Sequence, residues 1–162
     1  MRENETPILK PVSTCGLQAF ITDRLQLFSI IESILDEIGS ARMSVTSFSV
    51  SEEFIRKIFR MKQSGKLLNA RLVVDQKAAA KTARIIHFAG NVFDSLYFSK
   101  NHSKVVLLNN DTHSVSIITS QNLTRGNRKE STVITTDPVV FCELATDMDV
   151  LISESVKVCG TE

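Results

Sequence analysis

Several residue types are scarce in this chain, and their scarcity excludes whole classes of protein. Its 162 residues contain no tryptophan, one tyrosine, six glycines and three prolines. That composition excludes a collagen-like repeat and argues against a disordered, low-complexity chain. No apolar run approaches the roughly 18–20 residues that span a membrane, and the first residues lack the apolar core of a secretory signal. We therefore expect a soluble, cytoplasmic protein with no stable membrane association.

Cysteine is also scarce. Cys15, Cys142 and Cys159 are odd in number and far apart in the sequence, which predicts free thiols in a reducing compartment rather than a disulfide framework. Cys142 follows an apolar run and is expected to be a packing residue. No cluster of residues has the spacing of metal ligands, and no glycine-rich loop that cradles phosphates is present. We expect neither a metal nor another cofactor.

The composition is otherwise that of a globular protein. Hydrophobic residues make up 43% and charged residues 23% of the chain, and the length suits one domain with a sizeable core. Residues 1–12 are polar with two prolines and are predicted to be a flexible N-terminal segment. Residues 13–157 are interpreted as a single domain, and residues 158–162 as a C-terminal tail.

Charge is unevenly distributed, although the formal net charge is only +1. Residues 51–90 carry nine Lys or Arg against three Asp or Glu, whereas residues 131–162 carry one against six. If the basic residues share a face, that face would attract polyanions. The alternative interpretation is that the basic residues near 56–66 only line the solvent side of a helix.

Hydrophobic periodicity predicts alternating helices and strands. We expect helices over 23–38, 49–65, 78–88 and 137–153, and strands over 42–48, 70–75, 91–98, 102–108, 114–119 and 131–135. Gly39 and Gly90 are expected to end the helices that precede them. The order of these elements predicts an α/β sandwich, a mixed β-sheet flanked by helices.

Two helix starts have capping signals. Ser49 and Glu52 are interpreted as a capping box, and the helix that follows is expected to bury four apolar residues, Phe54, Ile55, Ile58 and Phe59. Asp137 is expected to cap the last helix, with a proline at its first position.

Four polar side chains around two predicted strands carry the chemistry. His102 and Lys104 are two residues apart on one strand, so they project to the same face. Ser120 and Asn122 follow the next strand, and hairpin pairing is expected to bring both pairs into a common pocket. Such a pocket suits chemistry at a phosphate, because imidazole attacks phosphorus or moves a proton while ammonium and amide donors hold the oxygens. Glu130 is interpreted as the carboxylate that orients the imidazole.

The pattern His102-x-Lys104, an apolar strand, Ser120-x-Asn122 and a later Glu130 resembles the signature of the phospholipase D superfamily. The resemblance covers about residues 13–155 and is greatest to small, nuclease-like members with one His-x-Lys motif. It implies a phospholipase D-like α/β sandwich and a metal-independent reaction through a phosphohistidine. Two histidines take part in that reaction, one as nucleophile and one as general acid. Because this chain has one such motif, the resemblance implies a homodimer.

The sequence departs from the family pattern at two positions. Asn109 stands where the family has an aspartate, with Asp111 two residues further on, and Thr119 stands where it has a glycine. The family aspartate is regarded as supporting the motif rather than contacting the substrate, so the proposed nucleophile remains. Thr119 could narrow the floor of the pocket. His87 and His113 lie outside the motif and are interpreted as structural or surface residues.

These observations favour a phosphodiesterase, an endonuclease that acts on DNA. His102 would be nucleophile or general acid, Lys104 and Asn122 would hold the phosphate, and Ser120 would add a donor. Three basic residues near the motif are expected to contact the nucleic acid: Arg125, Arg128 and Lys100. Tyr97 and Phe98 are the aromatic residues considered to lie near a substrate. Two alternatives stay open, a catalytically degenerate module that binds nucleic acid and a phosphodiesterase that acts on lipids or small molecules.

Overall fold

The computed structural model describes residues 8–80 and 83–160. Residues 1–7 of the expected flexible segment, and residues 161–162 of the expected tail, lie outside the described residues. Residues 8–12 are held by the domain rather than free. Val12 is 6% exposed, and its backbone N–H donates to Glu37 Oε2 over 2.8 Å. Lys10 exchanges two hydrogen bonds with the side chain of Gln18.

One mixed sheet of eight strands forms the centre of the fold, in the order β1-β7-β6-β5-β2-β3-β4-β8. β2, β3 and β4 are parallel neighbours, and the other pairings are antiparallel. The strands are β1 (Leu17–Thr22), β2 (Ala41–Ser47), β3 (Leu67–Asp75), β4 (Ser95–Ser99), β5 (Val105–Asn109), β6 (Ser114–Thr119), β7 (Glu130–Thr135) and β8 (Val156–Gly160).

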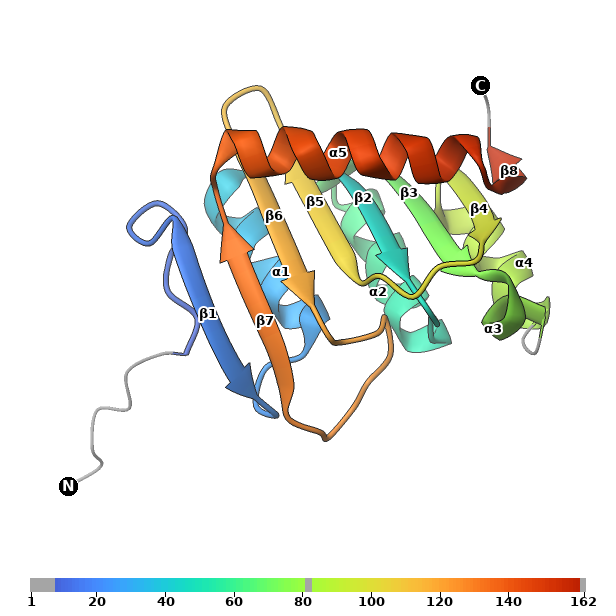
Figure 1. The fold of residues 1–162 in the computed structure, drawn as a ribbon, viewed down its shortest axis with the longest axis horizontal. Coiled ribbons are helices and arrows are strands. Elements are labelled where there is room, and N and C mark those ends of the chain that lie inside the picture. Colours follow the sequence, from blue (N-terminus) through green and yellow to red (C-terminus); the bar gives the residue numbers. More distant parts are fainter. Residues whose placement is uncertain (1–7, 81–82, 161–162) are drawn as a thin grey trace.

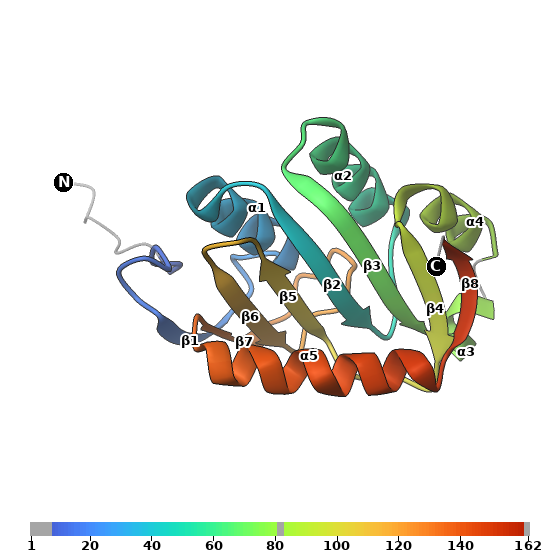
Figure 2. The same ribbon diagram turned by 90° about the horizontal axis from the view of Figure 1, so that it is seen from above.

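Helices cover both faces of this sheet. They are α1 (Leu27–Ile38), α2 (Glu52–Gln63), α3 (Gln76–Ala80), α4 (Ala83–Val92) and α5 (Pro138–Ser153). Figure 2 shows α1, α2 and α4 on one face and α5 on the other. The predicted mixed sheet flanked by helices is therefore confirmed.

The main core lies between the sheet and the layer of α1, α2 and α4. Alternate residues of β2 face this layer, and Met43 and Val45 are at most 1% exposed. The helical repeat of α1 supplies Ile30, Ile31 and Ile34, which are also buried. The apolar residues that recur every second position on the strands and about every 3.6 positions on the helices thus pack into one cluster.

The first helix begins four residues later than predicted, and a strand precedes it. β1 pairs with β7 at the edge of the sheet, with Leu17 opposite Thr135, and was not predicted. α1 starts at Leu27 because the buried side chain of Gln121 accepts the Leu27 N–H over 2.8 Å. This cap comes from a distant segment, so no local signal marks the start of the helix.

The start and the exposed face of α2 also differ from the prediction. The N-cap is Ser51 rather than Ser49, and its hydroxyl accepts the N–H of Phe54 over 3.2 Å. Phe54 is buried as expected, together with Ile55 and Ile58, but Phe59 is 45% exposed. The expectation that Phe59 is buried was therefore wrong.

The region 76–99 divides differently from the prediction. Two helices, α3 and α4, replace the single helix expected over 78–88. Gly90 lies inside α4 instead of ending it, and a Cβ there would lie 3.4 Å from Cys159 Sγ. β4 begins at Ser95, four residues after its predicted start.

The first three residues of the expected tail are part of a strand. Residues 158–160 belong to β8, which pairs antiparallel with β4 at one edge of the sheet. Gly160 has φ +119°, and a Cβ there would lie 2.3 Å from the carbonyl oxygen of Asp94, so only glycine fits this position. α5 begins as predicted, with the Asp137 carboxylate accepting the Val139 N–H over 2.8 Å.

The three cysteines are free, as predicted. Cys142, however, is exposed on α5, so its assignment as a packing residue was wrong. Along residues 8–80 and 83–160 no helix combines the length and the apolar character that crossing a bilayer requires.

Candidate functional site

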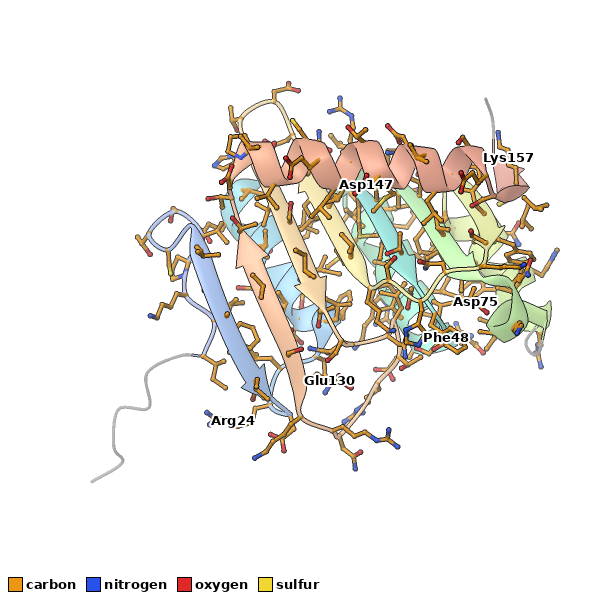
Figure 3. The ribbon with its side chains drawn as sticks, viewed as in Figure 1. Arg24, Phe48, Asp75, Glu130, Asp147 and Lys157 are labelled. Carbon is orange, nitrogen blue, oxygen red and sulfur yellow. The ribbon has the colours of Figure 1, made fainter. Side chains whose placement is uncertain are left out.

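All of the sequence-predicted site residues lie at or near the edge of the sheet that is formed by strand ends, not by an outer strand. The parallel strands β2, β3 and β4 end there, and the antiparallel strands β5 and β7 begin there (Figure 1). The carboxyl ends of parallel strands form the edge at which open α/β sheets bind ligands. Figure 3 shows the labelled side chains of Phe48, Asp75 and Glu130 along this edge, and that of Asp147 on α5 away from it.

The segment that carries His102 is a loop, not the start of a strand. β5 begins at Val105, so His102 and Lys104 do not project from one strand face as predicted. The reason is the buried side chain of Asn101, whose Oδ1 accepts the Ser103 N–H over 3.0 Å and the Ser103 hydroxyl over 2.6 Å. An Asn that captures the backbone two residues ahead replaces an extended strand by a turn.

Asn101 also ties this loop to the two neighbouring strand ends. Its Nδ2 donates to the carbonyl of Ser47 over 3.3 Å, and its own N–H donates to Asp75 Oδ2 over 3.2 Å. Ser103 adds a hydroxyl contact of 2.8 Å to Thr46. The loop is therefore fixed from β2 and β3, which leaves the intervening side chain of His102 exposed to solvent.

His102 and Lys104 lie together despite the loop. Lys104 Nζ is 3.2 Å from His102 Nδ1 and donates to the His102 carbonyl over 2.7 Å. An ammonium group only donates, so this contact needs an unprotonated Nδ1 and leaves the proton of a neutral ring on Nε2. The other neighbour of the ring is Phe48, whose centroid lies 5.3 Å from that of the imidazole, with the ring planes at 55°.

Ser120 and Glu130 form a second pair on the other side of this edge. The Ser120 hydroxyl donates to Glu130 Oε2 and accepts the Ser131 N–H over 3.0 Å. Among the described residues, Glu130 makes no hydrogen bond to His102. Its assignment as the group that orients the imidazole remains a prediction.

Asn122 lies between these two pairs, on a segment fixed by its neighbours. Leu123 exchanges backbone hydrogen bonds with Ser49 and Ser51, over 3.2 and 2.9 Å. Asn122 Oδ1 is 3.5 Å from the hydroxyl of Ser47, a residue whose carbonyl also binds Asn101. The end of β2 therefore supports both the Asn122 segment and the His102 loop.

The surface near these residues has a pocket and a separate groove. The first, which we name the His102 pocket, has a volume of about 380 Å³ and is lined by His102 and by Phe48, Asp75, Gln76, Lys77, Lys100 and Asn101. The second, which we name the Asn122 groove, consists of two hollows of about 270 and 320 Å³ that share Gln26, Asn122, Thr124 and Arg125. Arg128 and Glu130 also line the groove. Within one subunit the predicted residues thus divide between the pocket and the groove rather than lining one pocket, and Lys104 and Ser120 line neither.

Five residues that line the His102 pocket were not predicted as site residues: Phe48, Asp75, Gln76, Lys77 and Asn101. Asn101, two residues before Ser103, has the spacing of an Asx turn, a signal the sequence does contain. Phe48 meets His102 only because β2 pairs with β5, and no local pattern reveals that pairing. Neither Tyr97 nor Phe98 lines the His102 pocket; both lie on β4, and Phe98 packs against the core.

Many basic residues of segment 51–90 are paired with carboxylates, among them Lys57, which lines the Asn122 groove with its partner Glu53. Arg56 and Lys57 bind Glu52 and Glu53 on the same helix, and Lys62 binds Asp94. Hydrogen bonding by Lys57, with a contribution from the charge of Arg125, holds the pKa of the Glu53 carboxyl below its usual range. These contacts agree with the interpretation of a solvated helix side for α2.

The cations at the site have no such partners. Lys77, Lys100 and Lys104 make no ion pair with any described carboxylate. They lie after β3, after β4 and before β5, at the edge of the sheet that carries the site. An anionic ligand would therefore meet three ammonium groups that no described ion pair occupies, with Asp75 as the one carboxylate in the lining of the His102 pocket.

The two departures from the family pattern lie in different surroundings. Asn109 ends β5 opposite Arg42, at the other end of that strand from His102. Asp111 is 98% exposed and 4.0 Å from Arg42, too solvated to hold a motif together. Thr119 Oγ1 donates to the Ser131 carbonyl over 2.9 Å and lines neither hollow, so it does not narrow a pocket floor.

The two remaining histidines lie away from the site. His87 is exposed on α4, and His113 lies in the β5–β6 hairpin, where its Nδ1 is 2.8 Å from the Thr112 hydroxyl. No three His, Cys, Asp or Glu side chains of the described residues are grouped so that they could hold a metal ion.

Comparison with known proteins gives matches in structure only. No family model and no curated protein sequence matches the chain. The phospholipase D family member Nuc from Salmonella typhimurium superimposes with a TM-score of 0.67 at 15% identity, over 89% of this chain and 98% of Nuc. NucT from Helicobacter pylori gives a TM-score of 0.68 at 14% identity, over 88% and 98% of the two chains.

A third similar structure is TrmBL2, an archaeal chromatin protein described as having a novel mode of DNA binding. It gives a TM-score of 0.62 at 12% identity, over 97% of this chain and 57% of TrmBL2. Identities this low establish the fold alone. The chain has the phospholipase D superfamily fold, as its motif predicts.

Proposed function

On this phospholipase D superfamily fold, we propose that the chain is a phosphodiesterase that cleaves nucleic acid through His102. The observation that carries the proposal is the exposed imidazole with the Lys104 ammonium 3.2 Å from its Nδ1, at the edge of the sheet where β2, β3 and β4 end. An imidazole supplies the nucleophile or the acid, and an ammonium group stabilises the charge that develops on the phosphate oxygens.

The reaction proceeds in two steps. His102 Nε2 of one subunit attacks phosphorus, a P–N bond forms, and the P–O bond to the leaving group breaks. A second, protonated imidazole gives its proton to the leaving oxygen and then accepts one from the water that hydrolyses the phosphohistidine. Attack needs a free electron pair on Nε2, so the proton of the neutral ring must lie on Nδ1. Lys104 therefore has to leave Nδ1, and the phosphate of a bound substrate is the anion that draws it away.

The second imidazole is supplied by another copy of the chain. The chain has three histidines, and neither His87 on α4 nor His113 in the hairpin lies beside His102. A two-fold homodimer that brings two His102 pockets together provides both groups. Dimerisation also brings Lys104 of each copy to the same phosphate.

Nucleic acid is the substrate class that the charges favour. Arg125 and Arg128 line the Asn122 groove and Lys100 lines the His102 pocket, so both hollows carry cations. A polymer of phosphates uses all of them, whereas a single lipid headgroup does not. The similarity to TrmBL2, a protein described as binding DNA, agrees with this choice.

A second candidate function is nucleic-acid binding without cleavage. The hydrogen bond between Ser120 and Glu130 favours it, because Glu130 is thereby occupied and His102 lacks a carboxylate partner among the described residues. Cleavage separates the two functions. The phosphodiesterase degrades single-stranded DNA in EDTA, and a binding module leaves it intact at every protein concentration.

Subunit mixing tests the shared site. Wild-type protein is unfolded and refolded with increasing proportions of His102→Ala protein, and cleavage is measured at constant wild-type concentration. If each site needs both imidazoles, activity falls with the fraction of wild-type partners and approaches zero in excess variant. Activity that stays constant, or sedimentation of a fully active monomer, contradicts the homodimer.

A further inference from the structure

The His102 pocket contains more than a phosphate clamp requires. Its volume of about 380 Å³ lies in the range of sites that bind small organic molecules. The reacting phosphoryl group itself needs only His102, a few donors and Lys104, which lies beside His102 but outside the pocket lining. The aromatic ring of Phe48 and the ammonium groups of Lys77 and Lys100 line the remaining volume.

Phe48 is an aromatic residue that the core does not use. It follows β2 directly, is only partly buried, and is absent from the described residues that form or pack against the hydrophobic core. One neighbour of its ring is the imidazole of His102 at a centroid distance of 5.3 Å. An open aromatic surface beside the reacting group offers a stacking platform, and a nucleobase is the part of a nucleic acid that stacks.

The charge of the pocket suits the backbone of the same ligand. Lys77 and Lys100 make no ion pair with a described carboxylate, so both ammonium groups are available. Asp75, the carboxylate in the lining, is 7% exposed, and its oxygens accept backbone N–H groups of Lys77, Ala78 and Asn101 over 2.8–3.2 Å. These hydrogen bonds give Asp75 a structural role at the strand ends, and the two ammonium groups outnumber this one carboxylate in the lining.

We propose that the His102 pocket binds the unpaired nucleotide next to the cleaved phosphodiester, with its base on Phe48 and its neighbouring phosphate on Lys77 and Lys100. The inference rests on the proposed function, and it narrows the substrate to single-stranded nucleic acid. A base in a duplex is stacked on both faces and paired, so it cannot lie against Phe48. The lining offers a ring face, on which any base can stack, and ammonium groups, which bind the phosphate of any nucleotide.

The test measures binding in a His102→Ala background, so that cleavage cannot remove the ligand. Two probes are used, a short single-stranded oligonucleotide and an abasic strand of the same length. Phe48→Leu is expected to weaken binding of the base-bearing strand about 5- to 100-fold, the usual effect of losing one base stack, and to leave the abasic strand unaffected. Phe48→Tyr keeps the ring and the affinity. Phe59→Leu, at an exposed position of α2 outside the pocket, is the matched control and changes neither.

The two lysines give a different signature. Lys77→Ala and Lys100→Ala are each expected to weaken both probes and to lower the slope of log K against log salt by about 0.7. Lys10→Ala, an exposed lysine outside the pocket lining, leaves the slope unchanged. Thermal unfolding of every variant checks that the fold is intact.

Three results overturn the inference: equal loss of both probes in Phe48→Leu, no loss in that variant, or a duplex bound as tightly as the single strand. The proposed function fails by a separate result, cleavage by the His102→Ala protein at the wild-type rate. Because the binding assay does not depend on cleavage, a failure of this inference can be distinguished from a failure of the proposed function.

Discussion

Asn101 is expected to position His102, and its substitution gives the account a quantitative test. The side chain accepts two hydrogen bonds from Ser103, over 3.0 and 2.6 Å, and donates two longer ones to Ser47 and Ser103, over 3.3 and 3.4 Å. Each well-formed bond contributes about 1 kcal/mol, and the residue is 6% exposed, so water does not replace its partners freely. We expect Asn101→Ala to lower the free energy of unfolding by about 2–3 kcal/mol.

The effect on activity is expected to be larger than a loss of folded protein explains. His102 follows Asn101 directly, and displacement of a reacting group by about 1 Å costs up to about 100-fold in rate. We therefore expect kcat for phosphodiester hydrolysis to fall about 10- to 100-fold, with KM changed less. Urea unfolding and steady-state kinetics on the same preparation measure both quantities.

Asn110 supplies the matched control. It lies in the β5–β6 hairpin at the far end of β5, and its side chain makes a comparable set of hydrogen bonds, to Thr112, His113, Ile38 and Ser40 over 2.8–3.2 Å. Asn110→Ala should lose similar stability and keep its kcat. A kcat that falls equally in both variants, or not at all in Asn101→Ala, refutes the reasoning.

Three further predictions follow from other contacts. Phe54→Ala should lower stability by about 3–5 kcal/mol in chemical denaturation, because the ring is 5% exposed; a loss below about 1 kcal/mol contradicts its place in the core. Partial burial raises the pKa of the Asp94 carboxyl, but the hydrogen bonds from Lys62 and the Ala70 N–H, together with the Lys62 charge, outweigh burial and hold that pKa below its usual range. The stability that this lowered pKa contributes is complete above the unfolded pKa of about 3.9 and disappears as the pH falls through the folded value. Asp94→Asn should therefore lower the free energy of unfolding by about 1–2 kcal/mol at pH 7 and by little near pH 2. An equal loss of stability at both pH values refutes the prediction. Arg125→Ala should lower the salt slope of single-strand binding by about 0.7, whereas Arg60→Ala on α2 should not.

Elements with local signals were predicted well. The strand expected over 114–119 coincides with β6, and Asp137 caps α5 as expected. The pattern of alternating residues in 102–108 gave a strand that starts three residues early, because the side chain of Asn101 holds the backbone of Ser103 in a turn. Apolar alternation does not report such a competing hydrogen bond.

Elements fixed by distant partners were predicted poorly. The start of α1 depends on Gln121, 94 residues away, and β8 exists because it adds to the edge of β4. The site shows the same division. His102 and Lys104 were expected to meet on one strand face and meet instead in the loop before β5, whereas the contact with Phe48 and the separation of Glu130 from the imidazole depend on how β2, β5 and β7 are arranged.

The most direct test of the central claim is the rate at which the protein hydrolyses a chromogenic phosphodiester in EDTA. We expect His102→Ala to lose at least about 1,000-fold in kcat/KM, a loss of roughly 4 kcal/mol in transition-state stabilisation. His113→Ala, an exposed histidine of the β5–β6 hairpin, should retain the wild-type rate, and neither variant should unfold at a lower denaturant concentration. Equal rates for wild-type and His102→Ala protein would contradict the account.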